Sequence, residues 1–173
     1  MKNFKQYLRF VKACYPAVEW AGNKTLQEVV ATCHRGDWLL WLAQKCDIGL
    51  QPLTLAKGHC ANTVRHLMND ERSIRAVDVA IAFGEGKATR EELDAAAVAA
   101  VAAHAADDAA AANVAAYTAA NAAVNSDAYT AAVYAAYADA NADANANRMR
   151  TAVICRKYIG ELIVEKVNQI LTQ

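Results

Sequence analysis

Residues 91–147 constrain the fold more than any other part of the chain, because 29 of these 57 side chains are alanine and none is basic. Alanine has the highest intrinsic helix propensity, and its methyl group buries little apolar surface. The tract therefore predicts helices that pack at short distance, so that dispersion between neighbouring backbones replaces the burial of large side chains. Tyrosine and threonine recur in it at helical spacing, which indicates one contact face and one wetted face.

Helix is also the simplest prediction for the rest of the chain. Only two prolines and seven glycines occur in 173 residues, and no segment alternates apolar and polar residues as a strand does. The length corresponds to one domain. We predict a single all-α domain over residues 1–173, in which a bundle of short helices (1–88) packs against a long, acidic, alanine-rich antiparallel helical hairpin (89–147) and a C-terminal helix (148–173).

Local signals predict where the helices of the first part begin and end. Thr25 and Glu28 have the spacing of a capping box, which predicts a helix that continues to about Arg35. Gly36 is expected to end that helix in the left-handed conformation, and Asp37 to cap the next helix. The other helices predicted here run from Asn3 to Cys14 with Pro16 ending the first, from Pro52 to about Met68, and from Asp70 to Phe83.

A second capping box, Thr89 and Glu92, opens the alanine-rich tract. The polar run Asn125-Ser126-Asp127 predicts a break, because these side chains compete with the helix for backbone hydrogen bonds. Two long helices are therefore expected, at about 90–124 and 128–147, the second running on into 148–172 or kinking near the asparagines. The short connection between them favours antiparallel neighbours.

Charge is divided unevenly along a chain whose net charge is zero. Residues 1–90 carry 13 basic and 8 acidic side chains, residues 91–147 carry 8 acidic ones alone, and residues 148–173 carry 5 basic and 2 acidic ones. One interpretation is that the acidic helices lie against basic neighbours of the same chain. The other is an acidic surface that meets a basic partner; its candidate residues are Asp107, Asp108, Tyr134, Tyr137 and Asp139.

The run Cys33-His-Arg-Gly-Asp-Trp-Leu-Leu-Trp-Leu42 is the strongest local motif. In the structural interpretation, Asp37 caps a helix, Arg35 pairs with Asp37 or with a helix C-terminus, and the tryptophans and leucines enter the core. In the functional interpretation, Arg35, Asp37 and the edge of Trp41 form one polar pocket for a ligand or partner.

A second candidate binding cluster comprises His59, Arg65 and His66, which lie within about two helical turns of one another. The structural interpretation is a buried, hydrogen-bonded His59 and a last-turn cation at His66. Zinc sites need tighter ligand pairs, so we expect no metal and no cofactor. No spacing selects a cysteine nucleophile with its base, so no catalytic residue is assigned. The neutral charge balance and the lack of interleaved aromatics argue against nucleic acid as a partner.

The five cysteines are an odd number at spacings that suggest no disulfide framework, which indicates a reducing cytoplasm. No run of about 18 apolar residues predicts a membrane-spanning helix. The N-terminal residues MKNFKQYLRFVK lack the uninterrupted apolar stretch of a secretory signal.

Five segments together carry a family resemblance: VVATCHRGDWLLWLA, LTLAKGHCANTVRHLM, ERSIRAVDVAIAFGEGKATREEL, the Ala/Tyr/Asp tract, and TAVICRKYIGEL. In this order the chain resembles the alanine-rich immunity proteins of bacteria and phages, with their immunity-protein-five-like domain, over nearly its whole length from about Cys14. The resemblance implies a small all-helical protein that neutralises a toxin or another effector by binding it. It carries over Arg35, Asp37 and Trp41 as motif positions without assigned roles, and it supplies no catalytic residue.

The sequence and the resemblance together predict a non-enzymatic, cytoplasmic binding protein with a protein partner, such as an immunity or phage counter-defence factor that acts by occlusion. One alternative is a module that binds or sequesters a small molecule such as a nucleotide, through Arg35, His59, Arg65 and His66. The other is a structural protein that self-associates as a homo-oligomer through its alanine-rich helices.

Overall fold

The computed structural model describes residues 3–105, 118, 121–124, 130–138 and 144–173, and every regular element labelled in these residues is a helix. The predicted all-α fold is therefore confirmed. In chain order the helices are α1 (Phe4–Phe10), α2 (Tyr15–Ala21), α3 (Leu26–Thr32), α4 (Gly36–Lys45), α5 (Leu50–Asn62), the 3₁₀ helix η1 (Arg65–Leu67), α6 (Glu71–Gly84), α7 (Arg90–Ala105), α9 (Thr130–Ala138) and α10 (Ala144–Thr172).

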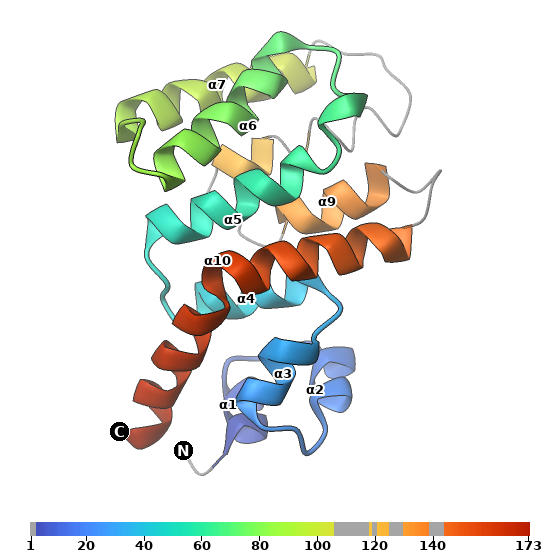
Figure 1. Cartoon of the computed structure of the whole chain (residues 1–173), viewed down its shortest axis with the longest axis vertical. Helices are drawn as coiled ribbons and strands as arrows, with labels where there is room; N and C mark the ends of the chain where they lie inside the picture. Colours follow the sequence, from blue (N-terminus) through green and yellow to red (C-terminus); the bar gives the residue numbers. More distant parts are fainter. Residues whose placement is uncertain (1–2, 106–117, 119–120, 125–129, 139–143) are drawn as a thin grey trace.

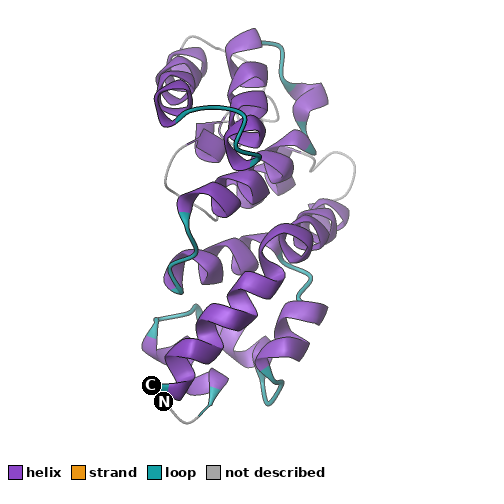
Figure 2. Cartoon of the chain, turned by 60° about the vertical axis from the view of Figure 1, so that its left-hand side comes forward, coloured by secondary structure: helices purple, strands orange, loops and turns teal. Residues whose placement is uncertain are grey.

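The long helix α10 organises the molecule. It contacts α3, α4, α5 and α9, and in Figure 1 it runs through the middle of the molecule to the end where both termini lie. One apolar core joins α1 to α5 with α10, and a second joins the end of α5 to α6, α7 and α9. In Figure 1, α6 and α7 of the second core lie at the end of the molecule away from both termini, and the turned view in Figure 2 shows the helices arranged along the same long axis.

Small residues allow close helix packing in the second core. Ala76 and Ala80 of α6 and Ala96 and Ala100 of α7 are all buried, and α6 packs against α7. A side chain at Gly58 of α5 would place its Cβ 2.9 Å from Cγ1 of Ile81 in α6, so this glycine sets the approach of α5 to α6. The described parts of the alanine-rich tract are therefore packed helices, as expected.

The predicted pairing within the tract is not the main contact that the described residues make. α7 packs on α6, whereas α9 lies against α5, α10 and α4. α9 and α10 pack against each other, so these two helices are not successive parts of one straight helix. The rest of the predicted helix 90–124 and the predicted break at 125–127 fall largely outside the described residues.

Capping predictions hold where the interactions are local. Thr25 and Glu28 form the capping box: Thr25 N donates to Glu28 Oε2 at 2.7 Å, and Glu28 N to Thr25 Oγ1 at 3.2 Å. Thr89 and Glu92 make the same pair of bonds, and Asp70 accepts a bond from the Arg72 amide at the start of α6. These three helix starts are confirmed.

Several predicted ends are wrong by about a turn. α1 ends at Phe10 rather than Cys14, because the chain enters the left-handed region at Lys12, and Pro16 lies in the first turn of α2. α3 ends at Thr32 rather than Arg35. α5 ends at Asn62, and η1 occupies most of the remaining stretch to Met68.

Within the described part of the chain, no helix has the length and apolar character needed to cross a membrane.

Candidate functional site

An apolar pocket of about 310 Å³ lies among α1, α2, α3 and α4 and is completed by Val133 of α9. All three tryptophans of the chain line it, and Arg35 and Asp37 supply its charged groups. We call it the aromatic pocket. Its lining consists of Phe4, Leu8, Ala13, Cys14, Ala17, Trp20, Ala21, Val29, Cys33, Arg35, Asp37, Trp38, Leu39, Trp41, Leu42 and Val133.

The start of α4 sets the position of the charged groups, and here the prediction for Gly36 and Asp37 is wrong. Gly36 is the first residue of α4 rather than a left-handed stop, and Arg35, not Asp37, occupies the N-cap position. A Cβ at Gly36 would lie 2.5 Å from Thr151 Oγ1 and 2.7 Å from Thr151 Cβ in α10. The glycine is needed because α4 begins directly against α10.

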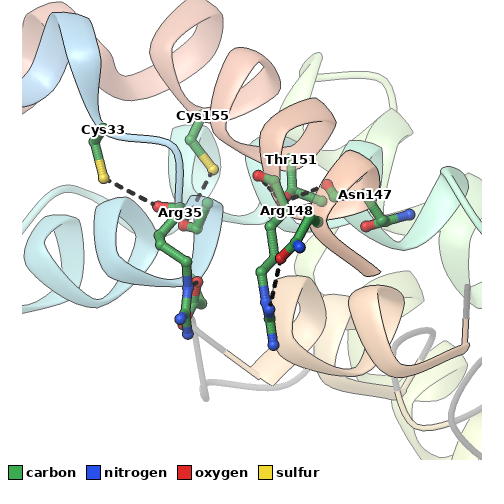
Figure 3. Close-up of polar contacts among 9 residues, drawn as sticks. Cys33, Arg35, Asn147, Arg148, Thr151 and Cys155 are labelled. Atoms are coloured by element: carbon green, nitrogen blue, oxygen red, sulfur yellow. Dashed lines mark hydrogen bonds and ion pairs between the residues drawn. The ribbon is translucent and has the colours of Figure 1, made fainter. Parts of the chain in front are cut away.

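Hydrogen bonds from α10 hold the same segment. Arg156 Nη1 donates to the carbonyl oxygen of Cys33 at 2.5 Å, and the Cys155 thiol donates to the carbonyl oxygen of Gly36 at 3.5 Å. The Cys33 thiol donates to the carbonyl oxygen of Arg35 at 3.4 Å (Figure 3). Backbone on both sides of Arg35 is thereby tied to α10, which fixes where its side chain starts.

Arg35 and Asp37 form a two-point ion pair at the pocket. Nε donates to Oδ1 at 2.8 Å and Nη2 to Oδ2 at 2.6 Å. The Arg35 side chain is 29% exposed and that of Asp37 11% exposed. The hydrogen bond to Asp37 raises the pKa of Arg35, so the guanidinium stays charged. It also lies over the Trp38 ring, 5.0 Å from the centroid.

The tryptophan faces carry further cations. Lys24 Nζ lies 4.5 Å from the Trp20 ring centroid, and Lys45 Nζ lies 5.7 Å from that of Trp41. His34 packs edge-on against Trp20 at 5.6 Å between ring centroids. Each of the three indoles therefore has a basic side chain of the protein over it.

Burial favours the protonated form of three thiols, of which Cys33 lines the pocket. Burial raises the pKa of Cys33 to about 11 and that of Cys46 to about 11, and it raises the pKa of Cys155 well above its ordinary range. Cys60 and Cys155 bring their sulfur atoms to 3.8 Å in the interior between α5 and α10. Because the thiolate is the reactive form, these groups are suited to packing rather than covalent chemistry.

The structure does not bring the second predicted cluster into one pocket. The His59 ring stacks on Tyr158 of α10 with 4.5 Å between centroids, and burial, followed by the charge of Lys157, lowers the pKa of His59. Arg65 pairs with Asp78 of α6, and His66 is exposed on η1. Arg35 lines the aromatic pocket, whereas His59, Arg65 and His66 are not among its lining residues.

The predicted acidic surface lies mostly outside the described residues. This applies to Asp107, Asp108 and Asp139, and the Tyr137 side chain is not described either. Tyr134 is half-buried and packs against the second core. Among the described residues there is no group of three metal-ligating side chains.

Comparison with known protein families, with characterised proteins and with solved structures finds no match.

The sequence located part of this site. Arg35, Asp37 and Trp41 were predicted to share a pocket, and the structure places all three in its lining. Trp20 and Val133 were missed, because they reach the pocket from α2 and α9 and no local motif contains them.

Proposed function

We propose that the chain is a non-enzymatic binding protein and that the aromatic pocket accepts an apolar side chain of a protein partner. The observation that carries this proposal is the convergence of all three tryptophans and the Arg35–Asp37 pair on one pocket of about 310 Å³. Tryptophan and arginine contribute most of the binding energy at many protein interfaces, where they form packed pockets that exclude water.

Rigidity of the pocket supports the same proposal. The contact of Gly36 with Thr151 and the hydrogen bonds from Cys155 and Arg156 fix the start of α4 before any partner arrives. A preformed site loses less conformational entropy on binding than a flexible one. The raised pKa of the Cys33 thiol, which lines the pocket, disfavours Cys33 as a nucleophile there.

An immunity role, the function implied by the resemblance of the chain, would use this pocket for occlusion. The partner would be an intracellular toxin or defence effector, and the bound protein would cover its working surface. The class of partner is implied by the family resemblance, and the aromatic pocket is the site proposed to bind it.

The test is capture of partners from the native host with three forms of the protein. Ala17→Phe fills the pocket, because Ala17 lines it, and Ala95→Phe adds the same ring at an exposed position of α7. A partner retained by the wild type and by Ala95→Phe but not by Ala17→Phe supports the proposal. Equal retention by all three forms, with unchanged helical circular dichroism, contradicts it.

A further inference from the structure

We infer that the anchor recognised by the aromatic pocket is the C-terminal residue of a polypeptide partner, with its apolar side chain in the pocket and its α-carboxylate on Arg35. This inference rests on the proposed function, since it specifies the chemistry of the group that the same pocket binds. It is carried by the hydrogen bonding of Arg35, the charges around the pocket, and the pocket volume.

The guanidinium of Arg35 has one edge in use and one edge open. Its hydrogen bonds with described residues run from Nε and Nη2 to Asp37. A guanidinium has five N–H donors, so both donors of Nη1 and one of Nη2 remain. With the side chain 29% exposed and lining the pocket, this second edge is available to another carboxylate. Two parallel N–H···O bonds to a carboxylate are the geometry that arginine favours.

Charge around the pocket favours an anion over a cation. Of the residues that line it, only Arg35 and Asp37 are charged, and Lys24 and Lys45 add two basic side chains over the rings of Trp20 and Trp41. Lys24, Arg35 and Lys45 already lie over the three indole rings. A cationic ligand would meet rings that are already occupied by like charge, whereas an anion would be attracted. Arg148 of α10 extends in the same direction as Arg35 in Figure 3.

The volume indicates the size of the anchor. About 310 Å³ is at the small end of the range of about 300–1,000 Å³ that is usual for ligand pockets. It fits one large side chain better than an extended ligand with several rings. An apolar side chain and a carboxylate attached to the same carbon atom are what a polypeptide chain presents at its C-terminus, and capture of that carboxylate is a known mode of peptide recognition.

The experiment compares acetylated tetrapeptides that end in phenylalanine as the free acid or as the amide, by isothermal titration with the whole chain. We expect the acid to bind at least about tenfold more tightly than the amide, because charge-assisted bonds to arginine are lost with the amide. Arg35→Gln combined with Asp37→Asn should abolish this preference without leaving a buried carboxylate unpaired. Arg72→Gln combined with Asp70→Asn removes a similar ion pair on α6 and should leave the preference intact.

The outcomes distinguish the carboxylate, the pocket and the polypeptide end as parts of the inference. Equal affinity of acid and amide, both lost in Ala17→Phe, would overturn the carboxylate while leaving the pocket as a binding site. Binding of the acid that survives Ala17→Phe, or no binding of either peptide, would overturn the inference and, in the first case, the pocket as well. Free 3-phenylpropanoic acid that binds as tightly as the peptide acid would overturn a polypeptide end as the source of the anchor.

Discussion

Substitution of Gly36 tests how the pocket is positioned, because two roles for this glycine predict opposite rankings. In the structure its place is fixed by contact: an added Cβ would lie 2.5–2.7 Å from atoms of Thr151. Ordinary carbon contacts are about 3.5–4.0 Å, so Gly36→Ala forces a shift of about 1 Å between α4 and α10. Overpacking of this kind costs about 1–3 kcal/mol, and the better helix propensity of alanine offsets at most about 1 kcal/mol.

Gly36→Ala should therefore lower the free energy of unfolding by about 1–2 kcal/mol, a drop in the urea midpoint of about 0.5–1 M. Gly36→Asn should be worse, since it adds more volume at the same contact. Had Gly36 been a left-handed helix stop, asparagine would be tolerated better than alanine. The assay is urea unfolding followed by circular dichroism at the helix band.

Gly49 provides the matched control. The nearest atom to a Cβ added at Gly49 is Pro52 Cδ at 4.0 Å, and Gly49 is the N-cap of α5. Because serine is a favourable N-cap residue, Gly49→Ser should leave stability unchanged or raise it by a few tenths of a kcal/mol. Asparagine at position 36 that proves more stable than alanine there would refute the packing argument.

Three further predictions concern thiols, a histidine and a helix cap. In the native protein iodoacetamide at pH 8 should modify Cys14 alone, since the other four cysteines are buried; rapid modification of more than one thiol per chain would contradict this. The lowered pKa of His59 means that the unfolded state binds the proton more tightly, so stability should fall as pH drops below about 6.5, the ordinary value for histidine. His59→Phe keeps a ring against Tyr158 and should reduce that pH dependence, as measured by thermal unfolding at pH 7.5 and pH 5; an unchanged dependence would show that other groups cause it. Thr25→Ala should cost about 1 kcal/mol of stability by removing the N-cap bond to Glu28, and a loss near zero in urea unfolding would argue against the capping box.

Sequence reasoning succeeded where interactions are local. The capping boxes at Thr25 and Thr89 and the cap at Asp70 depend on residues two or three positions apart, and all three are present. The prediction of a left-handed helix stop at Gly36 is wrong because the glycine is required by its contact with Thr151, a residue more than a hundred positions away in the chain. In the sequence, a glycine before a capping residue can be a left-handed helix stop or a site of close helix packing. Only the fold distinguishes these two roles.

The alanine-rich tract shows the same limit. In the described parts of the tract its composition correctly predicts helices, because alanine favours them at every position. The composition does not specify which helices pack together, since one alanine-rich helix face resembles another. In the described residues α7 joins α6, and α9 joins α5, α10 and α4, while much of the predicted hairpin lies outside these residues. The pocket was predicted only in the part that one motif contains, Arg35, Asp37 and Trp41, while Trp20 and Val133 depend on how α2 and α9 dock.

The most direct test of the aromatic pocket as the recognition site uses its own tryptophans. All three line it, so the three indole N–H signals in a proton–nitrogen NMR spectrum report on this pocket. Titration with a captured partner, or with the peptide acid, should shift all three signals and saturate at one equivalent. A partner that binds with measurable affinity while all three signals stay in place would contradict the account.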